Sequence, residues 1–227
     1  FSGGYINNAI EFVTVASTGD SIDFGDMVYR QYGQTGVNDT IRGVFCGGAS
    51  TTPFVPSHNA VHNVIQYVTI STTGNAVDFG DLLLTGFPSG SCNNTTRGII
   101  ARSNSPVATD FGDCISAGGG SASGGVCNAT RGIFAGGGVH NIIQFITMAT
   151  LGDAQDFGDL TENKGTVRGA SSKTRGLFVS GTTPTGVNTI ESVQIATTGN
   201  AADFGDMAYL GGDVSQNTCN SNAHGGI

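Results

Sequence analysis

The residues best suited to chemistry are aspartates that recur in the tetrapeptide Asp-Phe-Gly-Asp. The tetrapeptide occurs five times, at residues 23–26, 78–81, 110–113, 156–159 and 203–206. In the first copy Asp20, Asp23 and Asp26 lie within seven residues, and clustered carboxylates suit Ca²⁺. However, the spacing does not match an EF-hand loop, and an Asp side chain can also accept hydrogen bonds from backbone amides in a turn. Fivefold recurrence favours this structural role, so we expect no metal and no other cofactor.

A second motif combines a cation with an apolar strand. Arg-Gly followed by an apolar pair begins at Arg42, Arg97, Arg131 and Arg175. These arginines could line a ring for anionic ligands. Because Arg makes bidentate contacts with carboxylates, we expect them instead to tie neighbouring repeats to Asp partners. We expect the phenylalanines of the tetrapeptide to be structural too, namely Phe24, Phe79, Phe111, Phe157 and Phe204.

One inserted segment carries the best ligand-binding candidates outside the repeat. Arg42 and Asp78 are 36 residues apart, whereas the same interval is 25 residues from Arg131 to Asp156. The excess falls in residues 49–62, which contain Phe54, His58 and His62. Two prolines in this segment favour a loop over a helix, and a purely solvated loop is the alternative interpretation.

Several function classes lack support in the composition. There is no Gly-x-Ser-x-Gly nucleophile motif and no carboxylate couple outside the repeated positions, so we expect no enzymatic activity. The net charge of −8 argues against a nucleic-acid partner. No apolar run approaches the roughly 18 residues of a membrane-spanning helix, so we expect no membrane insertion.

The spacing of the motifs indicates a repeat architecture. The five phenylalanines are separated by 55, 32, 46 and 47 residues. A third motif, Asn and Ile leading into an apolar run, starts at Asn63, Asn141 and Asn188. Three motifs in constant order are typical of repeat proteins. A unit of about 46 residues accommodates four short strands and their loops, as in one blade of a β-propeller.

The four strands of a unit can be placed by these motifs. We predict the first before Arg-Gly, as at residues 89–93, the second in the Arg-Gly run, as at 132–135, the third in the Asn-Ile run and the fourth at Asp-Phe-Gly-Asp. Between the third and fourth strands lie Gly19-Asp20, Gly74-Asn75, Gly152-Asp153 and Gly199-Asn200. Such pairs predict two-residue hairpins. The third strand is largely apolar on both faces, as expected for a sheet stacked between two others.

The order of these motifs resembles the kelch repeat over essentially the whole chain. Gly47-Gly48 and Gly136-Gly137 correspond to the double glycine of kelch, and the Phe of Asp-Phe-Gly-Asp stands near the kelch Trp. The sequence of the repeat, Thr-Gly-Asn-Ala-x-Asp-Phe-Gly-Asp-Leu with Thr-Arg-Gly-(Val/Ile)-Phe, also resembles repeats in virion and tail-fibre-type proteins of marine bacteriophages. The resemblance implies an all-β, five-bladed, kelch-like propeller with mostly four-stranded antiparallel blades, forming a single domain over residues 1–227.

The ends of the chain and the third repeat qualify this prediction. Joined head to tail, residues 224–227 and 1–4 read like the start of a second strand, so we expect the N- and C-termini to share a blade; an excerpt of a longer array is the alternative. Arg97 and Asp110 are only 13 residues apart, so the third blade should lack its third strand.

The five cysteines are expected to be small buried hydrophobes. Cys92, Cys127 and Cys219 fall at one equivalent repeat position. Residues in different blades should be too far apart to form disulfides.

Composition and resemblance together favour a virion-associated structural or adhesion module. It would be virion-borne or extracellular after synthesis in a host cytoplasm. Its partners would be other virion proteins or a host-surface glycan, and it could form homo-oligomers. The alternatives are an intracellular kelch-type adaptor for a protein partner and a polysaccharide-active hydrolase or lyase.

Overall fold

The computed structural model describes residues 2–4, 7–51, 59–102, 111–115, 123–138, 140–183, 185–208 and 219. Within these ranges the regular secondary structure consists of β-strands, and no helix there could span a membrane. The chain divides into two compact units, Phe1–Pro88 and Ser89–Ile227, which we describe in turn. A single domain over residues 1–227 stays a prediction.

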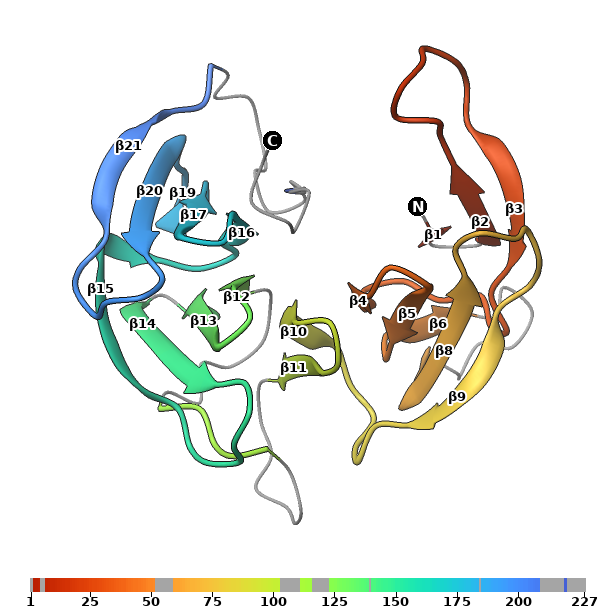
Figure 1. Ribbon diagram of the computed structural model, residues 1–227, viewed down its shortest axis with the longest axis horizontal. Helices are drawn as coiled ribbons and strands as arrows, with labels where there is room; N and C mark the ends of the chain where they lie inside the picture. Colours follow the sequence, from red (N-terminus) through yellow and green to blue (C-terminus); the bar gives the residue numbers. More distant parts are fainter. Residues whose placement is uncertain are drawn as a thin grey trace. The chain divides into compact units, whose positions relative to one another are not determined.

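The first unit contains two antiparallel sheets and a hairpin (Figure 1). The three-stranded sheet has the order β1 (Ser2–Gly4), β2 (Asn7–Phe12), β3 (Ile22–Asp26). The four-stranded sheet has the order β4 (Thr35–Asn38), β5 (Arg42–Cys46), β8 (Val64–Thr69), β9 (Val77–Asp81). The hairpin pairs β6 (Ala49–Thr51) with β7 (Asn59–Val61) and leaves the sheet between β5 and β8.

The second unit contains three sheets and a short hairpin. The two-stranded sheet pairs β10 (Pro88–Asn93) with β11 (Gly98–Arg102). The two four-stranded sheets are β12 (Ser123–Cys127), β13 (Arg131–Gly136), β14 (His140–Thr147), β15 (Gln155–Lys164), and β16 (Arg168–Ser171), β17 (Arg175–Val179), β20 (Thr189–Gln194), β21 (Ala202–Asp206). The hairpin pairs β18 (Thr182–Thr183) with β19 (Thr185–Gly186).

The predicted strand order within a repeat is confirmed in three sheets, each of which runs first, second, third, fourth strand in space. The third repeat differs in its described part, which forms only the pair β10–β11; the described Phe111–Asp113 segment is not a strand. Residues 103–110, where a third strand would have to lie, are outside the described residues, so the absence of that strand stays a prediction.

A β-bulge recurs at the tetrapeptide. In all four ladders between third and fourth strands the register shifts at one equivalent position, between Ile10 and Glu11 in the first repeat. Asp23 and Gly25 pair with those two residues, so Phe24 is the inserted residue. The glycine of the tetrapeptide has φ between +139° and +148° in all five copies, including the third, which is not in a strand. An L side chain is strained there, which explains the invariant Gly.

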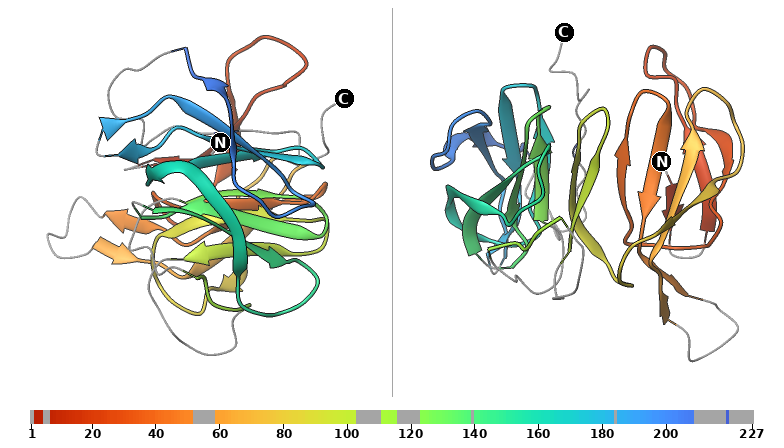
Figure 2. Two further views of the ribbon diagram at one scale, coloured as in Figure 1. Left: turned by 90° about the vertical axis from the view of Figure 1, so that its left-hand side faces the viewer. Right: turned by 60° about the horizontal axis from the view of Figure 1, so that its bottom comes forward.

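Sheets within the second unit pack so closely at their first strands that side chains are excluded. A Cβ on Gly125 of β12 would lie 2.3 Å from the carbonyl oxygen of Ser91 in β10. A Cβ on Gly169 of β16 would lie 2.4 Å from the carbonyl oxygen of Gly125. The glycine-rich first strands of three consecutive repeats therefore pack backbone to backbone, as the stack of sheets in Figure 2 illustrates.

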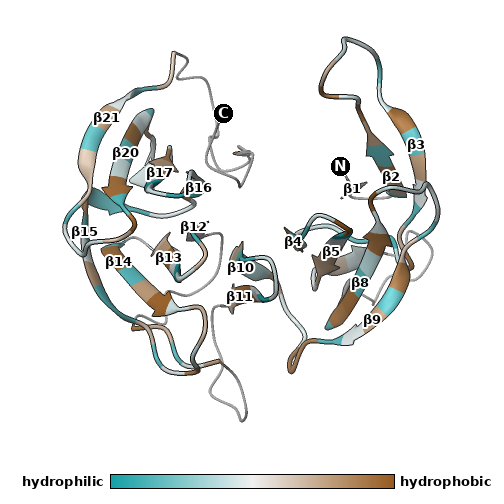
Figure 3. Ribbon diagram, in the orientation of Figure 1, coloured by the Kyte–Doolittle hydropathy of each residue, from teal (hydrophilic) through white to brown (hydrophobic). Residues whose placement is uncertain are grey.

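The core of the second unit lies between its two four-stranded sheets. Ile133, Ile143, Phe178 and Ile195 are fully excluded from solvent. The prediction that the third strand lacks a solvated face is confirmed for β14, where both alternating sets of side chains are buried in its second half. Figure 3 shows a polar position within this mostly apolar strand. β14 contains Gln144, whose side chain is only 6% exposed.

The predicted two-residue hairpins between third and fourth strands are wrong. In the second repeat β8 ends at Thr69 and β9 begins at Val77, so seven residues connect them. The reversal comes early in this connection, where the Thr72 amide donates to the Thr69 carbonyl at 3.2 Å. The Gly-Asn pair follows that turn, and its hydrogen bonds go to the preceding repeat.

Candidate functional site

Consecutive repeats are joined by a three-bond contact, which we call the repeat junction. In the first unit, the amides of Gly74 and Ala76 donate to the carbonyls of Phe24 and Asp26, at 2.7 and 2.8 Å. The Asn75 side chain accepts from the Asp26 amide at 3.0 Å. The Gly-Asn-Ala segment of one repeat thus binds the Phe-Gly-Asp backbone of the previous one.

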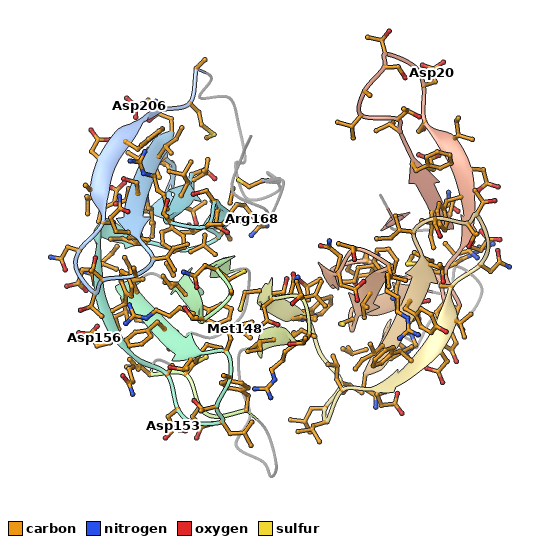
Figure 4. The ribbon with its side chains drawn as sticks, viewed as in Figure 1. Asp20, Met148, Asp153, Asp156, Arg168 and Asp206 are labelled. Atoms are coloured by element: carbon orange, nitrogen blue, oxygen red, sulfur yellow. The ribbon has the colours of Figure 1, made fainter. Side chains whose placement is uncertain are left out.

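The same junction occurs twice in the second unit with nearly identical geometry. Gly152 and Ala154 donate to Phe111 and Asp113 at 2.7 and 2.8 Å, and Asp153 accepts from the Asp113 amide at 3.0 Å. Gly199, Asn200 and Ala201 bind Phe157 and Asp159 at the corresponding distances of 2.7, 3.0 and 2.8 Å. Figure 4 shows Asp153 in the connection between β14 and β15. The junction therefore fixes the backbone of the Phe111–Asp113 segment, which is not itself in a strand.

A buried amide or carboxylate adds a fourth bond to each junction. Gln66 accepts from the Val28 amide at 2.8 Å, and Gln144 accepts from the Ile115 amide at 2.7 Å. At the third junction Glu191 accepts from the Thr161 amide at 2.6 Å. Gln66 and Glu191 are at most 1% exposed, so these bonds satisfy buried side-chain acceptors.

Glu191 also takes part in a fully buried ion pair. Lys164 at the end of β15 lies 2.5 Å from the Glu191 carboxylate, and the two side chains are 0% and 1% exposed. The Lys164 ammonium donates a further hydrogen bond to the Thr189 hydroxyl at 2.7 Å. The Thr161 hydroxyl contacts the same Glu191 oxygen that accepts from its amide. The pair links two repeats within the second unit, so its role there is structural.

The aspartates of the tetrapeptide bond to backbone. The side chains of Asp78 and Asp203 accept from the amides of Gly80 and Gly205, two residues on, at 3.1 and 3.0 Å. No group of three or more His, Cys, Asp or Glu side chains suited to a metal ion occurs in the part of the chain that the structure describes. The clustered Asp20, Asp23 and Asp26 therefore do not converge on one point.

The four repeat arginines stack on aromatic rings. Arg42 lies over Tyr67 and Arg131 over Phe145, at 4.7 and 4.8 Å from the ring centroids. Arg97 and Arg175 lie over Phe111 and Phe204, at 5.8 and 5.7 Å. The expected Asp partners are not found: the ion pair between Lys164 and Glu191 is the one present among the described residues.

Two of these arginines nevertheless join consecutive repeats, through carbonyl oxygens. Arg97 donates to the Met148 carbonyl at 2.7 Å. Arg131 donates to the carbonyls of Ile195 and Ala196 at 3.1 and 2.8 Å. The guanidinium is a planar donor with a polarised face, so one group can stack on a ring and bridge to the next repeat.

Three of the tetrapeptide phenylalanines pack edge-on against an aromatic residue of the third strand. Phe24 contacts Phe12 and Phe157 contacts Phe145, each with ring centroids 6.0 Å apart. Phe79 contacts Tyr67 at 5.9 Å. Phe79 and Phe204 are about half exposed and Phe157 is buried, so the same residue type packs to different depths.

The inserted segment of the first unit brings a small aromatic site together. His62 stacks on Tyr29, with ring centroids 5.3 Å apart and an interplanar angle of 14°. The His62 Nε2 atom lies 2.7 Å from the Ser50 hydroxyl, and the His62 amide donates to the Gly48 carbonyl at 2.8 Å. Tyr29 remains 46% exposed. We call Tyr29, Ser50 and His62 the aromatic site.

A second ring pair lies beside the base of the inserted hairpin. Tyr32 exchanges two backbone hydrogen bonds of 2.9 Å with Ala49, the first residue of β6. Its ring lies 5.8 Å from that of Phe87, which is 46% exposed. These two hydrogen bonds to Tyr32 fix the backbone at the start of β6, next to Ser50 of the aromatic site. The sequence motifs did not single out Tyr32.

Of the three predicted binding residues, His62 lies in this site, while Phe54 and His58 lie outside the described residues. Sequence reasoning missed Tyr29, Ser50 and Phe87, which come from three different segments. The signal that the sequence offered was a Tyr three residues after the tetrapeptide of the first repeat.

All five cysteines are free thiols, so the prediction that equivalent repeat positions form no disulfide is not contradicted. Cys92 and Cys127 nevertheless lie near each other, because the first strands of consecutive repeats pack backbone to backbone. The Cys92 thiol donates to the Met148 sulfur at 3.9 Å, and the Cys127 thiol donates to the Asn93 carbonyl at 3.2 Å. Burial is also uneven: Cys46 and Cys92 are buried, Cys127 and Cys219 are half-buried, and Cys114 is exposed.

The turn between first and second strands is closed by a side-chain acceptor in each of four repeats. Asp39 accepts from the amides of Ile41 and Arg42 at 2.7 and 2.6 Å. These bonds lower the pKa of the Asp39 carboxyl below its ordinary value. Asn94, Asn128 and Ser172 accept equivalent bonds in the other repeats.

Comparison with known proteins adds no assignment. No family model matches the chain, and no curated protein matches it.

Proposed function

We propose that the chain is a non-enzymatic structural or adhesion module of the phage tail-fibre or capsid-decoration type, in which the aromatic site binds a host-surface glycan. Its partners are other virion proteins or that glycan, and its place is the virion or the extracellular space.

The observation that carries the glycan proposal is the stacked pair of Tyr29 and His62 with the Ser50 hydroxyl at its edge. A half-exposed aromatic face can cover the apolar face of a sugar ring, while hydroxyl and imidazole groups offer hydrogen bonds to sugar hydroxyls. A few polar groups around an aromatic surface is a common pattern in small-ligand sites.

The proposed architecture is a closed five-bladed propeller with the two termini in one blade. It is supported by the repeat junction, which has the same hydrogen bonds in all three copies. Each junction needs two complementary halves, a Gly-Asn-Ala-type segment from one repeat and a Phe-Gly-Asp backbone from another. The first repeat has a Gly19-Asp20-Ser21 segment and the fifth has Phe204-Gly205-Asp206. Among the described residues, no atom lies within 4 Å of a Cβ added to Gly19 or Gly205. A ring closed through these halves leaves no open edge.

The test is a glycan array probed with the full chain and with its Tyr29→Ala variant, together with a search for peptides of the chain in purified virions. We expect binding to a small set of glycans, lost in the variant, and presence in particles. Absence from particles combined with no glycan binding at millimolar ligand would refute the proposal.

A protein partner is the second candidate, as in a kelch-type adaptor. Val28, Tyr29 and Phe87 are each 46% exposed, and exposed apolar side chains near one another can serve a protein interface. A pull-down that returned one partner at equal stoichiometry, lost in Phe87→Ala and unaffected by any glycan, would favour this function over the first.

A further inference from the structure

Cys92 and Cys127 form a thiol pair that bridges two sheets of the second unit. Cys92 lies in β10 of the third repeat, and Cys127 ends β12 of the fourth. Cys92 is 3% exposed and Cys127 is half-buried. The Cys127 thiol lies 3.2 Å from the carbonyl oxygen of Asn93, the residue after Cys92.

Gly132 makes room for this pair. It is the cross-strand partner of Cys127, and a Cβ on Gly132 would lie 2.5 Å from the Cys92 sulfur. The Cys92 side chain thus occupies the space that a side chain at residue 132 would need. The Cys92 sulfur therefore lies against Gly132, and Cys127 stands opposite the same glycine in the ladder. Because β10 and β12 cannot separate without breaking their glycine packing, the two cysteines stay close enough for their thiols to react with each other.

The two thiols differ in acidity in a way that suits one attacking and one resolving partner. The neighbouring Cys92 side chain lowers the pKa of Cys127 to about 7, against the effect of burial. The interaction with Cys127, together with burial, raises the pKa of Cys92. A thiolate is the nucleophilic form of cysteine, so Cys127 is the more reactive of the two near neutral pH.

The remaining cysteines do not share this arrangement. Burial raises the pKa of Cys46 to about 12, and burial also raises the pKa values of Cys114 and Cys219. Each of these three thiols is therefore mostly protonated at neutral pH and reacts more slowly.

We propose that Cys92 and Cys127 are an oxidation site at which a hydroperoxide forms a disulfide between the third and fourth repeats. The Cys127 thiolate attacks the peroxide oxygen, and an oxygen–oxygen bond breaks to give a sulfenic acid and, from H₂O₂ with one proton, water. The Cys92 thiol then attacks the sulfenic sulfur, forming the disulfide and releasing a second water. In sum, two thiols and one H₂O₂ give one disulfide and two waters.

The disulfide would secure a sheet of only two described strands. The described part of the third repeat pairs only β10 with β11, so it has less internal hydrogen bonding than the four-stranded sheets beside it. A covalent link between residues 92 and 127 restricts the unfolded chain. We expect the melting temperature of the oxidised chain to be about 5 °C higher than that of the reduced chain.

The experiment is peptide mapping of the full chain after treatment with equimolar H₂O₂. Trypsin leaves Cys46 with Cys92 on residues 43–97, and Cys114 with Cys127 on residues 103–131. The map is therefore made in the Cys46→Ala/Cys114→Ser background, where a link between these two peptides can only join Cys92 to Cys127. We expect this link as the main product, reversed by dithiothreitol.

The matched controls separate a prepositioned pair from general oxidation. Cys127→Ser should slow the consumption of H₂O₂ at least tenfold and abolish the rise in melting temperature, whereas the Cys46→Ala/Cys114→Ser background should keep both. In the unaltered chain, fragmentation of the linked peptide also identifies which two cysteines are joined. This measurement does not depend on whether any variant folds. A main product linking Cys219, or no linked peptide while Cys127 is oxidised to sulfinic acid, would overturn the proposal.

Discussion

Gly158 and Gly199 touch through their backbones, since a Cβ atom on Gly158 would lie 2.5 Å from the carbonyl group of Gly199. Gly158 follows the bulged Phe of the fourth repeat, and Gly199 opens the Gly-Asn-Ala segment of the fifth. The repeat junction therefore needs glycine for two separate reasons, a positive φ in one strand and close approach by the next repeat.

Gly158→Ala should destabilise the chain more than Gly80→Ala does. Both glycines have similar φ, +145° and +139°, but a Cβ on Gly80 meets nothing within 4 Å. The strain is common to both variants, so the difference isolates the close contact, which we expect to cost about 2 kcal/mol. Urea denaturation measures it, and equal midpoints for the two variants would show that the close approach is unimportant.

Gly205→Ala tests the closed propeller. Its φ is +141°, and nothing lies within 4 Å of its Cβ in the structure. In a closed ring Gly205 meets Gly19-Asp20 as Gly158 meets Gly199-Asn200, so the free-energy cost should match that of Gly158→Ala. A cost equal to that of Gly80→Ala would mean that this half of a junction has no partner in solution.

Glu191→Gln should be among the most destabilising conservative changes in the chain. It leaves the Lys164 ammonium buried without its carboxylate, and loss of one partner of a buried ion pair typically costs about 3–5 kcal/mol. The double variant Lys164→Met/Glu191→Gln should recover most of this loss, because Gln66 and Gln144 accept the equivalent backbone bond in other repeats. Thermal denaturation compares the unaltered chain, Glu191→Gln and the double variant. A Glu191→Gln variant as stable as the unaltered chain would contradict this account.

Tyr29→Ala should abolish glycan binding without a large loss of stability. The ring is 46% exposed, so truncation removes its stack with His62 but little buried surface. Leu83→Ala is the control, because Leu83 is an exposed apolar residue of the same unit at 63% exposure. Isothermal titration with the best ligand from the array should show at least a tenfold weaker affinity for Tyr29→Ala only.

Asp39 should titrate below its ordinary pKa of 3.8, because the amides of Arg42 and Ile41 hydrogen-bond to its carboxylate. A lowered pKa in the folded state means that the contribution is present above the pKa of the unfolded state and is lost as pH falls through the folded value. Asp39→Asn should keep the turn, as Asn94 and Asn128 do, and remove this acid dependence. NMR titration of the Asp39 carboxyl provides the measurement, and a value at or above 3.8 would contradict the expectation.

Periodicity predicted the strands well because each motif reports a local property. The Arg-Gly run, the Asn-Ile run and the tetrapeptide each became a strand at the expected place in the sheets that have four strands. The short interval after Arg97 predicts that the third repeat lacks its third strand, and this stays a prediction because residues 103–110 lie outside the described residues.

The junctions could not be predicted, because the same residues suit a different local structure. Gly followed by Asn is favoured in tight hairpins, but Gly74-Asn75 bonds to a strand 49 residues earlier. The burial of Gln66 was equally hidden, since its partner Val28 belongs to another repeat. The contact between Cys92 and Cys127 depends on how far sheets are apart, and that distance is set by Gly125 and its neighbours. The aromatic site combines three segments that share no motif.

Every repeat junction is directional. Each repeat binds the preceding repeat through its Gly-Asn-Ala segment and the following repeat through its Phe-Gly-Asp backbone. Duplication of one whole repeat within the gene would therefore create a new repeat junction without disrupting an existing one. Lineages that carry this motif could gain or shed modules by recombination between copies, and the surface presented by an inserted loop could diversify while the connectors stayed constant.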